Sequence, residues 1–244
     1  MEAEEEGGIV RAGGGSFENR MTPVQTALGW CYFPLHFILL PVLLRLYAAV
    51  SGTLDGAGIN LIYYGAGTAF LLFVMLPWLR DSFDLLLDRP GSCVRGIVTA
   101  AALSFGCSLL MGLLLMALGD VDPNPNDTEI MAQASRDNGV IMSLAIFIGP
   151  LIEETLFRGV VFGSLRRRSR VLAYLVSLFL FCLYHVWQYA VYNGDITMLL
   201  YGLEYIPIGL VITWCYESTE CIWTTIFFHM ANNALTFFIL QGAG

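Results

Sequence analysis

Seven apolar runs, each about as long as a bilayer-spanning helix, take up roughly two thirds of this 244-residue chain. A helix needs about 20 mostly apolar residues to cross a membrane, because its backbone polar groups must all be paired within the segment. The runs are Val24–Val50, Ile59–Leu79, Gly96–Gly119, Val140–Gly163, Val171–Tyr192, Met198–Tyr216 and Cys221–Leu240. The sequence therefore predicts an all-α polytopic membrane helix bundle with about seven transmembrane helices, within a range of six to eight.

Composition excludes the other broad classes. Hydrophobic residues make up 57% of the chain and charged residues 13%, which leaves too little polar surface for a soluble domain and too much apolar surface for a disordered chain. The net charge of -8 opposes the attraction to phosphate on which nucleic-acid binding depends. We expect the lipid bilayer, and no nucleic acid, as a partner.

The segments outside the apolar runs suggest the domain organisation. Residues 1–23 are acidic and Gly-rich without an apolar stretch, which predicts a disordered acidic tail and not a signal peptide. Arg80–Arg95 mixes apolar and charged residues, which predicts a short interfacial helix ended by Pro90-Gly91, and Asp120–Gly139 is expected to be a long loop. We divide the chain into the tail (1–23), N-terminal membrane helices (24–139) and a C-terminal helical core (140–241).

The arginines predict an orientation. All 12 basic residues are Arg, and arginines beside span ends resist translocation. With the N-terminus inside, the inside segments hold nine arginines and the outside segments hold only Arg136. We expect an integral membrane protein with a cytoplasmic N-terminus and, after seven spans, a C-terminus outside. The lack of Lys and the short connections favour a prokaryotic cell membrane.

Few ionisable residues lie inside the apolar runs, and at membrane depth each is a functional candidate because it is costly to insert. Glu154 and Arg158 are four residues apart, share a helix face, and are expected to neutralise each other. Glu153 points about 100° away around the helix and lacks a local partner, which suits proton transfer. A buried ion-pair network that only fixes packing is the alternative. Arg45 and Glu204 are expected to pair, to line a cavity or to serve packing alone.

Two later runs supply imidazoles. His185 follows Phe181 and Tyr184, and an aromatic packing role is its alternative. His229 and Asn233 are four residues apart and project from one helix face, as two neutral donors that could stabilise an oxyanion. An interhelical hydrogen bond is the alternative for this pair.

A hydrolytic site explains these residues jointly. Glu153 and His185 would polarise a water, and His229 and Asn233 would stabilise the oxyanion that forms when this water attacks an amide. A zinc site would use Glu153, His185 and His229 as ligands and leave the fourth position to water, but the HExxH spacing is missing. We favour the version without metal or other cofactor and keep zinc as the alternative.

The motifs of the last four runs, in this order, resemble those of the CAAX-protease and bacteriocin-processing family of intramembrane endopeptidases. They are Glu153-Glu154-xxx-Arg158, Phe181-xxx-His185 and His229-xxx-Asn233. The resemblance covers approximately residues 140–240. Eukaryotic members of the family remove the last three residues of prenylated CAAX proteins.

The resemblance implies the same roles for these residues. Glu153 and His185 would activate water. Glu154 and Arg158 would support the site. His229 and Asn233 would form the oxyanion hole. Residues 1–139 match no family pattern, so they leave the choice of substrate open.

The implied fold has a polar cavity that opens to the cytoplasm. With Arg166 at the inner surface, Glu153 would lie about 20 Å deep at 1.5 Å per residue. Gly149-Pro150 is expected to bend its helix and to free carbonyl groups toward the cavity.

The expected activity is that of an intramembrane protease. Its partner would be a peptide or membrane-protein substrate, either a prenylated CAAX protein or a leader or bacteriocin peptide. Two other functions stay open at this point: a non-catalytic bacteriocin-immunity or scaffold protein, and a proton-coupled transporter in which the buried charges form a relay.

Overall fold

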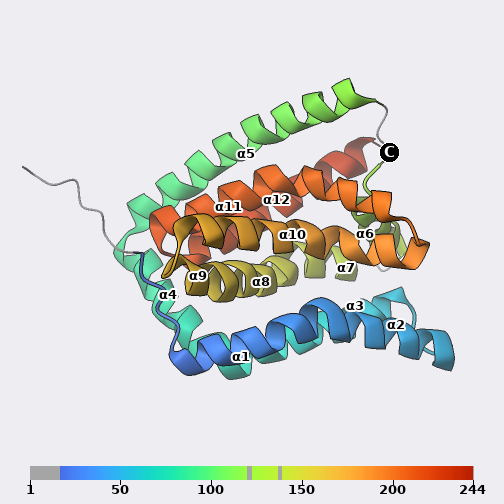
Figure 1. Ribbon diagram of the computed structural model, residues 1–244, viewed down its shortest axis with the longest axis horizontal. Coiled ribbons are helices and arrows are strands. Elements are labelled where there is room, and N and C mark those ends of the chain that lie inside the picture. The colour runs from blue at the N-terminus through green and yellow to red at the C-terminus, as the bar shows by residue number, and fades with distance from the viewer. Residues whose placement is uncertain (1–16, 120–122, 137–138, 244) are drawn as a thin grey trace, which may run out of the picture.

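The computed structural model describes residues 17–119, 123–136 and 139–243, and within them every regular element is helical. The helices run side by side along one direction, with α5 along the edge of the bundle (Figure 1). Six of them are long and apolar enough to cross a membrane: Pro23–Ser51, Gly56–Asp88, Pro90–Ala117, Val140–Arg166, Arg170–Asn193 and Ile196–Thr219. The predicted all-α polytopic membrane bundle is confirmed. The seventh apolar run forms α12, Ile222–Ala243, which packs against α11 and α5.

Three of these spans contain wide π-helical turns. The first span consists of α1 (Pro23–Pro34), η1 (Leu35–Leu39) and α2 (Leu40–Ser51), and the second of α3 (Gly56–Phe70), η2 (Leu71–Met75) and α4 (Leu76–Asp88). The fourth consists of α7 (Val140–Ser143), η3 (Leu144–Ile148), α8 (Gly149–Glu154), η4 (Thr155–Phe162) and α9 (Gly163–Arg166). The remaining elements are α5 (Pro90–Leu118), α6 (Pro125–Arg136), α10 (Arg170–Asn193), η5 (Ile196–Tyr205) and α11 (Ile206–Thr219).

Prolines account for the position of three wide turns. Pro41, Pro77 and Pro150 each follow a π-helical segment by two residues. A proline inside a helix has no N–H to donate, and its ring clashes with the carbonyl group four residues earlier. A wide turn at that point relieves the clash and leaves a carbonyl group free for another partner. The fourth span therefore bends just before Glu153.

Two expectations about the connections are wrong. Arg80–Arg95 is not a separate interfacial helix, because α4 continues the second span without a break to Asp88 and Pro90 starts α5. The expected loop Asp120–Gly139 contains the helix α6. Asn124 accepts a hydrogen bond from the backbone N–H of Asn126, at 3.0 Å, just ahead of Pro125. A side-chain cap followed by proline is a helix start signal.

Part of the predicted tail packs on the core. Phe17, Asn19 and Met21 are buried, and Asn19 Nδ2 donates a 2.9 Å hydrogen bond to the carbonyl oxygen of Gly159. The ring of Phe17 makes edge contacts with Phe162, with centroids 5.5 Å apart. Residues 17–22 are therefore held against η4. The remaining residues of the predicted tail, 1–16, lie outside the described part of the chain.

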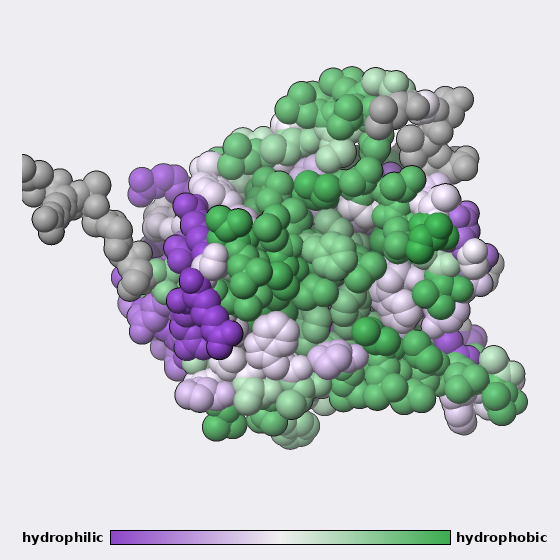
Figure 2. Space-filling view, viewed as in Figure 1, coloured by the Kyte–Doolittle hydropathy of each residue, from purple (hydrophilic) through white to green (hydrophobic). Residues whose placement is uncertain are grey.

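The two ends of the bundle differ in charge. At one end, called here the arginine end, α4 and α9 finish and α5 and α10 begin, and hydrophilic side chains gather there in Figure 2. Glu217 joins this cluster, with oxygens 2.6 Å from Arg166 Nε and 2.8 Å from Arg170 Nη2. The opposite end, called here the α6 end, contains α6 and the start of α7 (Figure 1).

Glycines allow the helices to approach closely where the fourth span crosses the others. A Cβ atom on Gly67 of α3 would overlap Ile152 Cδ1 and lie 3.0 Å from Ile152 Cγ1, whereas one on Gly65 would meet nothing within 4 Å. Ile152 is 1% exposed and directly precedes Glu153. The packing of α3 thus sets the position of the glutamate.

We expect Gly67→Ala to lower the stability of the protein in detergent by about 1–3 kcal/mol, the usual cost of overpacking a core. Thermal or denaturant unfolding measures this change. Gly65→Ala, two residues away on the same helix, is the matched control and should leave stability unchanged or slightly raised. Equal stability of the two variants would contradict the proposed close packing of α3 on Ile152.

Candidate active site

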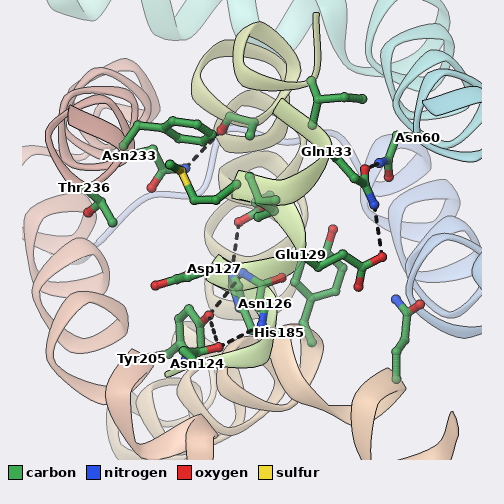
Figure 3. Close-up of a pocket in the computed structure, with 18 of the residues that line it drawn as sticks. Asn60, Asn124, Asn126, Asp127, Glu129, Gln133, His185, Tyr205, Asn233 and Thr236 are labelled. Carbon is green, nitrogen blue, oxygen red and sulfur yellow. Dashed lines mark hydrogen bonds and ion pairs between the residues drawn. The ribbon is translucent and has the colours of Figure 1, made fainter. Parts of the chain in front are cut away.

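A cavity of about 370 Å³ lies between the helices, and most of its wall belongs to the α6 end of the bundle. Its lining comes from α2, α3, α5, α6, the fourth span, α10, η5, α11 and α12, and it includes Glu153, His185, His229 and Asn233. Figure 3 shows polar side chains facing this space from several elements. Four residues that the sequence places on three different apolar runs therefore meet in one cavity.

Glu154 and Arg158 lie behind this cavity and are completely buried. Arg158 Nη1 donates to Glu154 Oε1 at 3.1 Å, as the spacing of four residues predicts. The guanidinium also donates to the carbonyl oxygen of Gly209 at 3.1 Å and lies 4.3 Å from the ring centroid of Phe181. The pair therefore joins η4 to α10 and α11, as well as neutralising its own charges.

Glu154 also fixes the orientation of His229. The Nδ1 atom of His229 lies 2.7 Å from Glu154 Oε1. Because this oxygen belongs to a carboxylate paired with Arg158, it accepts, and Nδ1 is the protonated ring nitrogen. The other nitrogen, Nε2, is then an acceptor in the neutral ring and faces Glu153.

His185 has the same tautomer for a different reason. Its Nδ1 lies 2.8 Å from the carbonyl oxygen of Phe181, which can only accept a hydrogen bond. Nδ1 therefore donates, and Nε2 is the acceptor. Tyr205 stacks on the imidazole, with centroids 4.1 Å apart and an angle of 21° between the planes. Both histidines thus present Nε2 to the cavity from held rings.

Glu153 completes a group of three acceptors. Its Oε2 atom lies 3.8 Å from His185 Nε2 and 3.9 Å from His229 Nε2. This oxygen is buried and has no hydrogen-bond partner among the described residues. Separations of this size between polar atoms leave room for a bridging water. A water at this point could donate to two of the acceptors and keep a lone pair free.

Asn233 is already engaged by the wide turn of the fourth span. Its Nδ2 donates to the carbonyl oxygen of Ala145 at 3.0 Å. Ala145 belongs to η3, the π-helical turn that precedes Pro150. The expectation that Gly149-Pro150 frees a carbonyl group is met here. One amide hydrogen of Asn233 remains for another acceptor.

The types of side chain in this cavity match those of a zinc site, but their placement does not. Two imidazole Nε2 atoms and a carboxylate are ligand types that zinc takes, and oxygen partners hold both Nδ1 atoms as in known zinc sites. Among the residues that the structure describes, however, no group of three or more His, Cys, Asp or Glu is placed to hold a metal ion.

The helix α6 adds polar residues to the cavity that the sequence does not predict. Asn124 Nδ2 donates to Glu204 Oε2 at 2.8 Å, and Asn126 Nδ2 donates to the hydroxyl of Tyr205 at 3.1 Å. Burial, together with the neighbouring carboxylate of Glu204, raises the pKa of Asp127. The Asn124-Pro125 start signal was available in the sequence, but nothing local shows that α6 folds back over η5.

Arg45 and Glu204 both line the cavity but do not pair with each other. Arg45 lies 3.7 Å from Glu129 of α6 and stacks over the ring of Tyr192, with its guanidinium 4.5 Å from the centroid. Glu204 instead accepts a hydrogen bond from Asn124.

A pair of tyrosines was also missed. The hydroxyls of Tyr63 and Tyr184 lie 2.8 Å apart in the cavity wall. A single hydrogen bond between two hydroxyls uses one of their two hydrogens, so the pair retains a donor.

The cavity lies toward one end of the bundle. It reaches Arg45, Asn60 and Gln133, and the last belongs to α6. At the arginine end the interior is filled by Phe17, Phe162 and other aromatic residues. If the arginine end is cytoplasmic, the cavity lies nearer to the other side of the membrane. The cytoplasm-facing cavity stays a prediction.

Comparison with known proteins gives two matches for the part of the chain that holds the motifs. Residues 136–235 match the family model described as Type II CAAX prenyl endopeptidase Rce1-like. The protein named "Putative membrane peptidase YdiL" of Bacillus subtilis (strain 168) is 28% identical over 103 residues, which are 42% of this chain and 37% of that protein. The chain therefore aligns with little more than a third of this relative. No solved structure matches it significantly. The resemblance that the three motifs predict is confirmed: residues 136–235 are similar to the Rce1-like family of type II CAAX prenyl endopeptidases.

Proposed function

We propose that this protein is an intramembrane endopeptidase in which Glu153 and His185 activate a water to hydrolyse a peptide bond. One observation carries the proposal: Glu153 Oε2 and the Nε2 atoms of two histidines converge in a single cavity, at 3.8 and 3.9 Å. The family match supports the reaction class.

The first step is the attack of water on the amide carbon. Water donates one hydrogen bond to Glu153 Oε2 and another to His185 Nε2, and its free lone pair faces the substrate. As the C–O bond forms, one water proton passes to the Glu153–His185 pair and the carbonyl π electrons move to the oxygen. The tetrahedral intermediate then collapses, the C–N bond breaks, and the stored proton goes to the leaving amine.

His229 and Asn233 serve the oxyanion in this proposal. Neutral His229 cannot donate from Nε2, because its proton sits on Nδ1 toward Glu154. It can donate only if it enters the reaction as an imidazolium, with a proton on Nε2 taken up from solvent before the attack and the carboxylate of Glu154 to stabilise the charge. Asn233 contributes its remaining amide hydrogen. Preorganised donors of this kind are worth about 10²–10³-fold in kcat.

We propose that the reaction needs no metal or other cofactor. The zinc version would use Glu153, His185 and His229 as ligands, and zinc would supply a more acidic bound water.

The substrate would be a peptide or membrane protein. Two substrate classes are proposed: a prenylated CAAX protein, or a leader or bacteriocin peptide.

Glu153→Gln and His185→Asn are expected to lower kcat by at least about 10²-fold, since each removes a group that handles the proton. The assay uses purified protein in detergent with internally quenched peptides, including farnesylated ones. Asp81→Asn, an exposed residue at the arginine end, is the control and should retain full activity.

The same assay tests the cofactor proposal. Activity should survive thorough chelation, with no bound metal found by elemental analysis. Loss of activity on chelation with recovery on adding zinc would overturn the metal-free version. Cleavage that survives Glu153→Gln would overturn the assigned site, and solute uptake dependent on Glu153 without any cleavage would favour a transporter.

The two adjacent glutamates should differ in their effect on stability. Glu154→Gln leaves the buried charge of Arg158 without its counterion, and breaking a buried pair in this way costs about 3–5 kcal/mol. Glu153→Gln removes a carboxylate oxygen that has no hydrogen-bond partner in the described part of the chain, so stability should be unchanged or raised. Thermal unfolding in detergent compares the two variants, and an equal loss in both would contradict this assignment.

We further propose that the arginine end faces the cytoplasm of a prokaryotic cell, with the N-terminus inside and the C-terminus outside. The arginine distribution supports this orientation, and the cavity then faces the other side of the membrane. An epitope inserted at Gly194, in the exposed turn after α10, should be accessible in intact cells. An epitope inserted at Arg168 should be accessible only after permeabilisation, and the reverse pattern would invert the orientation.

A further inference from the structure

We propose that Asp127 and Glu204 bind a positively charged group of the substrate, so that the enzyme prefers peptides with a lysine or arginine side chain within a few residues of the scissile bond. The inference rests on the proposed peptidase function and names the substrate class of the same cavity.

The two acids adjoin residues that contact Tyr205, the aromatic ring beside His185. Glu204 directly precedes Tyr205, whose ring stacks on His185. Asn126, next to Asp127, donates to the hydroxyl of the same tyrosine, and Figure 3 shows Asn126 and Asp127 near Tyr205 and His185. Both acids line the same cavity as the catalytic histidine, into which the residues flanking the scissile bond must fit.

The described cavity wall carries more negative than positive charge. Four described carboxylate residues line the cavity: Asp127, Glu129, Glu153 and Glu204. Arg45 is the single arginine among the described lining residues, and it already contacts Glu129 and the ring of Tyr192. Three carboxylates are thus left without a cation from this wall. Burial raises the pKa of Asp127, and the nearby carboxylate of Glu204 raises it further.

One oxygen of this wall is both buried and unpaired. Glu153 is only 8% exposed, and its Oε2 atom faces the same cavity without a hydrogen-bond partner from the described residues. Buried carboxylate oxygens are normally paired, so an unpaired one points to a group that arrives from outside. The cavity is therefore built to receive a polar guest, and its wall favours a cationic one.

The wall also argues against binding a free C-terminal carboxylate beside the catalytic residues. Such a group needs a cation or several N–H donors. The single arginine of the described lining is taken, and three negative charges would repel the group. A bond inside a peptide, flanked by a basic residue, fits this charge pattern better than one next to a C-terminus.

The test uses quenched peptides that are identical except for Lys, Gln or Glu at one position near the scissile bond. For the wild-type protein we expect kcat/KM to be about tenfold higher for the Lys than for the Gln peptide, and lowest for the Glu peptide. The double variant Asp127→Asn, Glu204→Gln should lose the preference, so that its kcat/KM values for the Lys and Gln peptides become equal. Asp127→Lys should reverse the order and favour the Glu peptide.

Two control variants show whether a lost preference comes from the charge of the cavity wall or from a general effect of the substitutions. Asp81→Asn removes one negative charge at the other end of the bundle and should keep the preference, as should Asp127→Glu, which keeps the charge in place. A wild-type protein without preference, or a preference that survives the double variant, would overturn the proposal.

Peptide binding can be measured without cleavage, so it tests the cationic site independently of the proposed peptidase function. Glu153→Gln protein can be titrated with fluorescent Lys and Gln peptides, and anisotropy measures the two affinities. Tighter binding of the Lys peptide that is lost in the Asp127→Asn, Glu204→Gln background supports the cationic site even if no peptide is cleaved. Equal binding of both peptides would overturn it, whatever the activity.

Discussion

The arrangement of the site depends on one buried carboxylate, Glu154. A single oxygen of this residue accepts from Arg158 at 3.1 Å and from His229 Nδ1 at 2.7 Å. The arginine reaches on to the carbonyl oxygen of Gly209, so the group joins the fourth span, α11 and α12. The same contact decides which nitrogen of His229 faces the cavity. A network of this kind is strong only when all its members are present, because each would otherwise be an unpaired polar group in a low-dielectric interior.

Proline chemistry connects the backbone to this network. The wide turn required ahead of Pro150 releases the carbonyl group of Ala145, and Asn233 of α12 binds it at 3.0 Å. The glutamates follow immediately on the bent helix, with Gly67 of α3 packed on Ile152. Backbone irregularity at membrane depth is tolerated where its free groups find partners inside the protein. Here the partner is a residue of the candidate site itself.

The parts of this arrangement that the sequence predicted are local ones. Hydropathy located the spans, and spacing by four residues paired Glu154 with Arg158, because both properties depend on one helix alone. The contacts of Glu204 with Asn124 and of Tyr205 with Asn126 join residues about 80 positions apart, and they depend on how α6 folds back. The end of the bundle at which the cavity lies could not be predicted for a similar reason. It depends on Phe17 and Phe162 filling the arginine end, and Phe17 belonged to a segment expected to be disordered.

Arginines are concentrated at one end of the bundle, so the acidic residues at the two ends differ in whether they have a positively charged partner. At the arginine end, Glu217 has Arg166, Arg170 and the hydroxyl of Tyr174 as partners within 2.8 Å. At the α6 end, Arg45 is the one arginine of the described cavity wall, and it pairs with Glu129. Glu204 accepts a hydrogen bond from Asn124, and neither it nor Asp127 has an arginine partner in this wall. Basic residues on one side orient a membrane protein, and the same choice leaves the other side acidic. A cavity with an acidic wall favours cationic side chains over carboxylates. The proposed orientation of the bundle and the proposed charge of its substrate would then both follow from where the arginines lie.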